Sequence, residues 1–320
     1  MSTTETAQVS TTEARLDGSR SYHGQPVIRE PVWSWEIPLY FYLGGVAGAS
    51  AGLAYLLERR GDEEPARRAW ATALATISVS PALLISDLGR PARFLKMMRM
   101  FKVTSPMSIG YWVLSGAGAS TGLAAVNAWT GWFPRAGRIA KPAAALLGLP
   151  LSTYTAALLA NTAVPVWHEG RRWLPFVFGS GAALSAGAIA VVVNPPRRAR
   201  PARRLALGAA VVEGPLMELM THRLGPHADP YRHGKPALLA NVSRACIAGG
   251  AALLYGRGGT SRAAAVAAGA LLSAGALATR WSVFRAGFDS AADPKYVVAP
   301  QRAAIERGER RGAARVQQRV

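Results

Sequence analysis

Residues 37–57 read IPLYFYLGGVAGASAGLAYLL, a run without a single charged side chain. As an α-helix this run is about 30 Å long, which matches the hydrocarbon core of a bilayer. Seven more apolar stretches of similar character follow it, and the charges fall mostly between them: Trp70–Leu88, Ile109–Trp129, Pro142–Val164, Trp173–Val193, Leu205–Met220, Ala237–Tyr255 and Ala263–Phe284. The pattern predicts an all-α integral membrane protein, a bundle of eight transmembrane helices with both termini on the same side.

The flanking sequence divides the chain of 320 residues into three parts. Residues 1–32 are a polar tail without the apolar core of a cleaved signal peptide, residues 33–284 hold the predicted spans, and residues 285–320 form a basic tail. The nine tryptophans lie near the ends of the apolar stretches, which is typical of an interfacial aromatic belt. Gly44, Gly48 and Gly52 recur every four residues and predict the close approach of another helix.

Composition excludes several functions. The formal net charge is +19, but most basic residues lie in short loops or near the C-terminus, without interleaved aromatic residues. This arrangement favours orientation in a membrane over nucleic-acid binding. Cys246 is the only cysteine, whereas an iron–sulfur cluster usually takes four thiolate ligands. No histidine lies in the middle of a predicted span, so we expect neither haem nor another metal site in this chain.

Nearly all the ionisable groups of the predicted spans fall in one half of the membrane, on the side of the two termini. The candidate site residues in that half are Glu36, Tyr40, Asp87, Arg90, Tyr154, Glu213, Arg244 and Arg280. Charged groups are costly in lipid and usually face a cavity or a partner. The asymmetry therefore predicts a functional site in that half.

Two of these assignments keep a structural alternative. Glu213 and Arg244 are predicted at matching depths, about 10 Å from one face, where they could pair. The pair would be a salt bridge between neighbouring helices, or it would line a proton path or a ligand cavity. Asp87 would be catalytic, or it would cap a turn or contact Arg90 across i, i+3.

Several motifs in order resemble the NrfD/PsrC family of membrane subunits. They are WSWEIPLYFYLGGVAGAS (33–50), SDLGRPARF (86–94), TSPMSIGYW (104–112) and YTAALLANTAVPVWHEGRRWLPFVFGSGAALSAG (154–187), and the similarity runs from about Trp33 to Phe284. The resemblance implies a membrane subunit that holds no metal itself and binds a quinone or quinol, menaquinone or ubiquinone. It also implies an iron–sulfur partner subunit, which exchanges electrons with a catalytic subunit, often a molybdopterin enzyme.

The resemblance also implies roles for individual residues. Tyr154 matches a fourth-helix tyrosine that contacts quinone in the family, and Glu36 and Tyr40 stand in a first-helix region of polar quinone contacts. Asp87 and Arg90 match the family's Asp-Leu-Gly-Arg-Pro motif. Quinone carbonyls need hydrogen-bond donors and their reduction takes up protons. The cofactor-binding candidates are Tyr40, Arg90, Tyr154 and Arg244, and the proton-exchanging, catalytic candidates are Glu36, Asp87 and Glu213.

These observations predict a membrane-anchoring subunit in the cell membrane that exchanges electrons between the quinone pool and an iron–sulfur partner. Such a chain would not be catalytic alone. A membrane transporter is the first alternative, because a buried Glu213–Arg244 pair and the Gly-Pro step after Glu213 suit a broken transporter helix. A passive anchor without quinone turnover is the second.

Overall fold

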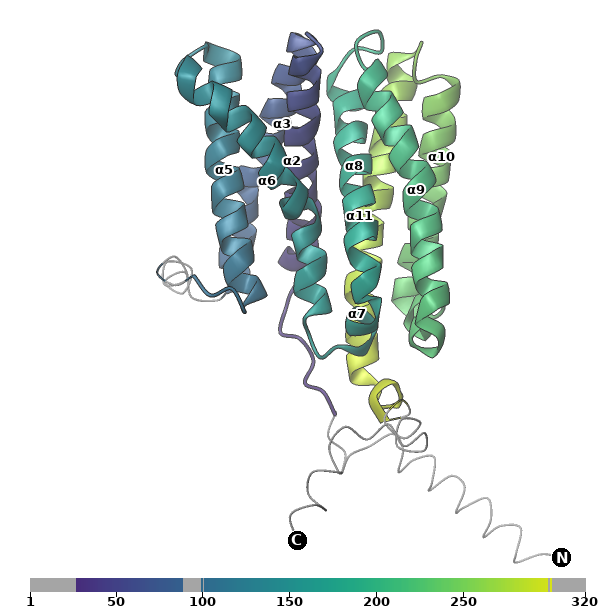
Figure 1. The fold of residues 1–320 in the computed structure, drawn as a ribbon. Coiled ribbons are helices and arrows are strands. Elements are labelled where there is room, and N and C mark those ends of the chain that lie inside the picture. The colour runs from purple at the N-terminus through teal and green to yellow at the C-terminus, as the bar shows by residue number, and fades with distance from the viewer. Residues whose placement is uncertain (1–26, 89–98, 100, 299, 301–320) are drawn as a thin grey trace, which may run out of the picture.

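The computed structural model describes residues 27–88, 99, 101–298 and 300, and within these ranges the chain is helical, with no strand. Eight of the described helices have 20 or more residues (Figure 1). They are α2 (Glu36–Arg59), α3 (Glu63–Asp87), α5 (Pro106–Thr130), α6 (Pro134–Ala160), α8 (Leu174–Val193), α9 (Arg200–Leu224), α10 (Gly234–Gly256) and α11 (Arg262–Ala292). Short helical turns, α7 (Pro165–Glu169), η1 (Gly170–Arg172) and η2 (Gly225–Tyr231), join some of them.

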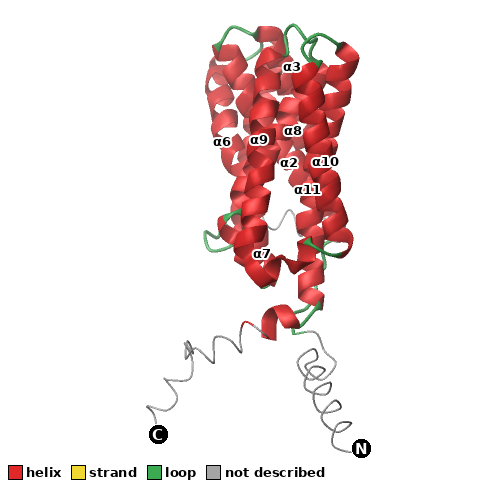
Figure 2. Cartoon of the chain, turned by 90° about the vertical axis from the view of Figure 1, so that its right-hand side faces the viewer, coloured by secondary structure: helices red, strands yellow, loops and turns green. Residues whose placement is uncertain are grey.

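The long helices form two groups of four that stand side by side (Figure 1), and they all run roughly along one long axis of the molecule (Figure 2). The first bundle packs α2, α3, α5 and α6 together, and the second packs α8, α9, α10 and α11. Helix α2 also contacts α8 and α11, so it joins the two bundles. Helix α2 begins and α11 ends at one end of the molecule, called here the lower end after Figure 1, and α2 reaches the upper end at Arg59.

Seven of the described helices are long and apolar enough to cross a membrane, which makes the chain a multi-pass membrane protein. The predicted eighth span, Leu205–Met220, falls on α9, which does not meet the same criterion. Helix α9 is the least apolar of the eight, because it carries several charges along its length: Arg200, Arg203, Arg204, Glu213, Glu218 and Arg223. The prediction of eight spans is therefore confirmed for seven.

Local sequence signals explain where helices begin and end. The Ser105 side chain accepts a hydrogen bond from the Ser108 amide, and Pro106 occupies the first turn of α5. Gly131 ends α5 in the left-handed conformation with φ of 74°. The side chain of Ser261 accepts from the Ala264 amide at the start of α11. The last span was predicted to end at Phe284, but helix α11 continues to Ala292.

The small residues of α2 allow close helix contacts, but only some of the predicted glycines make them. A Cβ at Gly48 would overlap the backbone of Gly148 on α6, and a Cβ at Gly148 would overlap Gly48. Gly45 lies against Ala182 of α8, where a Cβ would come within 3.2 Å. By contrast, a Cβ at Gly52 would meet nothing within 4 Å. The close approach therefore depends on Gly45 and Gly48 rather than on the whole repeat.

The tryptophans do not all belong to an interfacial belt. Trp35, Trp129 and Trp132 are well exposed, as a belt requires, but Trp70 and Trp167 are completely buried. The Trp167 indole donates a 2.8 Å hydrogen bond to the Val283 carbonyl of α11. Trp167 thus holds the lower end of the second bundle together and is part of its core.

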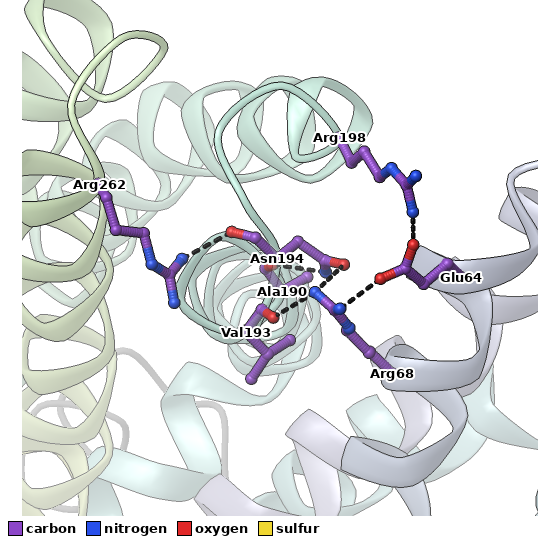
Figure 3. A network of polar contacts seen from close by, with 7 residues as sticks. All are labelled: Glu64, Arg68, Ala190, Val193, Asn194, Arg198 and Arg262. Carbon is purple, nitrogen blue, oxygen red and sulfur yellow. Dashed lines mark hydrogen bonds and ion pairs between the residues drawn. The ribbon is translucent and has the colours of Figure 1, made fainter.

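A polar network ties α3, α8 and α11 at the upper end (Figure 3). Arg68 donates to the Val193 carbonyl at 2.9 Å and pairs with Glu64, which also pairs with Arg198. On the other side, Arg262 donates to the Asn194 carbonyl at 2.6 Å. These arginines satisfy the free carbonyls at the C-terminus of α8, which have no partner within their own helix.

We predict that Gly48→Ala weakens the contact between α2 and α6. The added methyl group overlaps the Gly148 backbone, and overpacking of this kind costs about 1–3 kcal/mol. The midpoint of thermal unfolding in detergent should fall. Gly52→Ala is the matched control and should not lower the midpoint, because its methyl group enters open space. Equal midpoints for the two variants would contradict the prediction.

We also predict that acid releases the segment after α11. Lys295 Nζ lies 3.1 Å from Asp229 Oδ2 of η2, and this hydrogen bond holds the pKa of Asp229 below its ordinary value. The ion pair therefore contributes its full stability at pH values above the pKa of aspartate in the unfolded chain, near 4. That contribution is lost as the pH falls through the lower pKa that Asp229 has in the folded chain.

Hydrogen exchange of residues 293–298 measures this release. Protection factors, which correct for the much slower intrinsic exchange in acid, should be high at neutral pH and lower near pH 3 in the natural chain. In Asp229→Asn they should be low at both pH values, because the ion pair is absent. Protection that is independent of pH in the natural chain would show that the pair does not anchor the segment.

Candidate functional site

At the lower end, Ser34 joins two of the predicted catalytic carboxylates. The Ser34 amide and hydroxyl both donate to Asp87 Oδ1, at 3.1 and 2.9 Å, and the hydroxyl also contacts Glu36 Oε2. The Ser34 hydroxyl therefore lies between the two carboxyl groups. Glu36 and Asp87, which are 51 positions apart in sequence, form one partly buried acidic group.

Two tyrosines lie deeper in the same bundle. Tyr40 is one helical turn after Glu36 and is 1% exposed. Tyr154 of α6 is an electrostatic neighbour of Tyr40. Its ring lies so close to Gly110 of α5 that a Cβ there would overlap the ring. Glu36, Tyr40, Asp87 and Tyr154 thus lie toward the lower end of the first bundle, on helices α2, α3 and α6.

Neither tyrosine hydroxyl has a hydrogen-bond partner among the described protein groups. Phenolic hydroxyls that are enclosed in a bundle usually find a partner, because an unpaired polar group is costly. Tyr40 and Tyr154 are therefore free to donate to a ligand with carbonyl oxygens. Arg90, the remaining predicted ligand contact of this region, lies outside the described residues.

The predicted pairing of Glu213 with Arg244 is wrong. Arg244 Nε lies 3.2 Å from Glu218 Oε1, and both of these side chains are more than half exposed. Glu213 is 1% exposed and points to the interior of the second bundle. Positions 213 and 218 differ by about 140° around a helix with 3.6 residues per turn. Depth alone, which guided the prediction, does not distinguish these two faces.

Glu213 instead faces Arg280 of α11, which is 2% exposed. The two side chains converge on Gly181 of α8, where a Cβ would lie 3.0 Å from Arg280 Nη1 and from Glu213 Oε1. Arg280 Nη2 donates to the Phe178 carbonyl at 2.6 Å, and its guanidinium lies 4.1 Å from the centre of the Phe178 ring. Because α11 is longer than predicted, Arg280 lies within the helix and not at its end.

The Glu213–Arg280 group is incompletely satisfied. Both carboxylate oxygens of Glu213, and Nε and Nη1 of Arg280, lack a hydrogen-bond partner in the described part of the protein. Buried charges left in this state are costly. A cavity of about 310 Å³ between α9, α10 and α11 reaches Glu213 and is also lined by Ser243, Arg244 and Thr279. A ligand or water in this cavity would reach the unpaired carboxylate.

Sequence reasoning missed Ser34, Gly110, Gly181 and the pairing of Arg280. The serine could have been noticed, because it stands two residues before Glu36 at a helix start, where short polar side chains bind nearby groups. The two glycines give no local signal, since their role is to leave space for side chains from other helices. Within the described ranges, no group of three or more His, Cys, Asp or Glu residues is placed to hold a metal ion.

Comparison with known proteins identifies a family. No curated protein matches the chain. A family model described as "Polysulphide reductase, NrfD" matches residues 22–225, which is more than half of the chain. The matched part contains Glu36, Tyr40, Asp87, Tyr154 and Glu213, and it ends before α10 and α11. With this match and its multi-pass helical fold, the chain belongs to the NrfD family of polysulphide reductase membrane proteins.

Proposed function

We propose that this chain is the quinone- or quinol-interacting membrane subunit of a larger oxidoreductase in the cell membrane. The observation that carries the proposal is the lower-end group, in which Ser34 joins Glu36 and Asp87 near the unpartnered hydroxyls of Tyr40 and Tyr154. Family membership supports it, because NrfD proteins work with iron–sulfur and catalytic subunits. The partners proposed here are an iron–sulfur subunit and a molybdopterin-type catalytic subunit.

The proposal includes α9 as an eighth span, with both termini on one side of the membrane. Helix α9 has 25 residues and packs against α8 and α10. Its charges are accommodated without exposing most of them to lipid tails. Arg200, Arg203 and Arg204 lie in its first two turns, Glu218 pairs with Arg244, and Glu213 faces inward to Arg280.

The chemistry needs donors and protons at the same place. A bound quinone supplies two-electron redox chemistry, and its full reduction to quinol takes up two electrons and two protons. The hydroxyls of Tyr40 and Tyr154 donate hydrogen bonds to ligand oxygens and orient the ring. Glu36 and Asp87 exchange protons with the lower aqueous side through Ser34. The electrons come from, or go to, the iron–sulfur partner.

The lower end also offers a surface for that partner. Val32, Trp35, Phe101 and Val103 are exposed there, with exposed fractions from 59% to 80%. Exposed apolar side chains at a water-facing end are available for contact with another protein. A partner subunit seated on them would lie next to Glu36 and Asp87, as short-range electron transfer requires.

A transporter is the second candidate function, and one observation favours it. Glu213 and Arg280 are buried near the middle of their helices, and Glu213 borders a cavity between α9, α10 and α11. Transporter sites commonly lie at such a depth. Glu213 would then exchange protons or bind a solute, independently of the lower-end group. Solute uptake by vesicles that contain the chain, abolished in Glu213→Gln, would favour this function over the proposed one.

We predict that Tyr154→Phe in the assembled complex weakens quinone binding. The variant removes one hydroxyl donor and keeps the ring over Gly110, so affinity should fall about tenfold, as expected for one lost hydrogen bond. Titration of a quinone analogue measures the change. Tyr255→Phe is the control, since Tyr255 is 83% exposed on α10. Equal affinity in Tyr154→Phe and the control would remove Tyr154 from the proposed site.

We predict that Ser34→Ala slows quinone-linked turnover by roughly tenfold or more, because it interrupts proton exchange between Glu36 and Asp87. The rate should also depend differently on pH, and Ser34→Thr should restore it by returning the hydroxyl. Ser86→Ala is a nearby control, because the Leu83 carbonyl is the one hydrogen-bond partner of the Ser86 hydroxyl among the described residues. A pH profile in Ser34→Ala that equals that of the natural chain would show that the hydroxyl does not relay protons.

A further inference from the structure

A groove with no part in the proposed redox site runs along the outside of the protein between the two bundles. Its volume is about 750 Å³, and α2, α6, α8 and the start of α9 form its walls. Its floor is made of residues with little or no side chain: Gly48, Ala49, Gly52, Gly179 and Ala183. Open space at Gly52, where a Cβ would meet nothing within 4 Å, shows that no protein side chain fills this part.

The groove has the length and chemistry of a lipid chain site. Along α2 it extends from Arg60 to Gly48, which is about 18 Å at 1.5 Å per residue. One leaflet of the hydrocarbon core is about 15 Å thick, half of the bilayer's 30 Å. The remaining walls are largely leucine, including Leu56 and Leu149, which are 58% and 67% exposed. A single acyl chain would cover these apolar side chains over one leaflet.

Two arginines line the upper end of the groove. Arg60 follows the end of α2 and Arg204 lies in the second turn of α9. Both are exposed, and neither has an ion-pair or hydrogen-bonding side-chain partner among the described residues. They meet from two helices at one opening, so their positive charges add there.

Nearby carboxylates do not neutralise these two arginines. Glu58 pairs with Lys141 at 3.0 Å and accepts from the Trp70 indole, and Glu63 pairs with Arg67 at 3.5 Å. Glu64 is held between Arg68 and Arg198 (Figure 3). Asp62 stands two positions after Arg60 but forms no ion pair with it. Among the described residues, then, no carboxylate pairs with Arg60 or Arg204, and both arginines are available to an anion from outside the chain.

We propose that this groove binds one anionic phospholipid, with its phosphate between Arg60 and Arg204 and one acyl chain along the glycine floor. Guanidinium groups bind phosphate oxygens through two parallel hydrogen bonds, and basic pockets between membrane helices hold anionic headgroups. Arginines that merely reach to the membrane surface would need no groove below them. The site is independent of the quinone site, which lies at the other end of the first bundle.

The test is native mass spectrometry of the full chain, purified in mild detergent and supplied with phosphatidylglycerol or with phosphatidylcholine of the same acyl chains. The natural chain should retain one phosphatidylglycerol, with at least a tenfold preference over phosphatidylcholine. Arg60→Gln combined with Arg204→Gln should remove the preference. Arg59→Gln is the matched control, because Arg59 is the adjacent exposed arginine but does not line the groove.

A second variant tests the acyl-chain part. Gly52→Leu places a side chain in the open groove and should reduce retention of phosphatidylglycerol about tenfold, while both arginines remain. The thermal unfolding midpoint identifies any variant that fails to fold. If Gly52→Leu does not fold, the double arginine variant alone tests the proposal. Equal retention of the two lipids by the natural chain would overturn the proposal. So would normal retention in a folded Gly52→Leu or in the double arginine variant.

Discussion

A charge inside a membrane protein must be paired or must reach water, and this constraint explains where the polar groups of this chain lie. Arg262 and Arg68 satisfy the carbonyls at the end of α8. Glu218 and Arg244 meet on the outside, between α9 and α10. Glu213 and Arg280 are the exception, because they face one another deep in the second bundle and retain unpaired atoms. Such an exception is expected where a protein performs chemistry or binds a ligand.

Much of the fold could be predicted from the sequence because lipid imposes a simple rule on helix length and composition. Seven of the predicted spans agree with helices that meet that rule. The rule is weakest for α9, where Glu213 is buried and faces Arg280 while Glu218 pairs with Arg244. Hydropathy counts a charge in the same way whether or not it is buried or paired. The ends of helices were harder to predict. Helix α11 passes Phe284 without a breaking residue and stops at Ala292, just before Asp293 and Pro294.

The predicted site residues form two separate groups, because depth along a helix can be predicted from sequence but rotation about the helix axis cannot. The residues Glu36 and Asp87 could be placed together because each stands at the end of a span on the same side. Glu213 and Arg244 were matched by depth along their helices, but the rotation of each helix about its own axis decides which side chain faces inward. That rotation depends on packing at positions such as Gly181 and Gly48, where the absence of a side chain lets a neighbour approach. A single sequence does not reveal which glycine has this role.

Helix α2 contacts both groups of polar residues, the lower-end group around Glu36 and the Glu213–Arg280 group. Glu36 and Tyr40 lie one turn apart and face the first bundle, whereas Tyr42 is turned about 200° from Tyr40 and is an electrostatic neighbour of Arg280 in the second. The backbone contact at Gly48 and the close contact at Gly45 fix α2 against α6 and α8. Because packed helices do not separate gradually, a change of charge at either group cannot be relieved by moving α2 away. The change of charge must be compensated locally by a proton, a water molecule or a ligand. Both groups have unpaired polar atoms that can bind one of these.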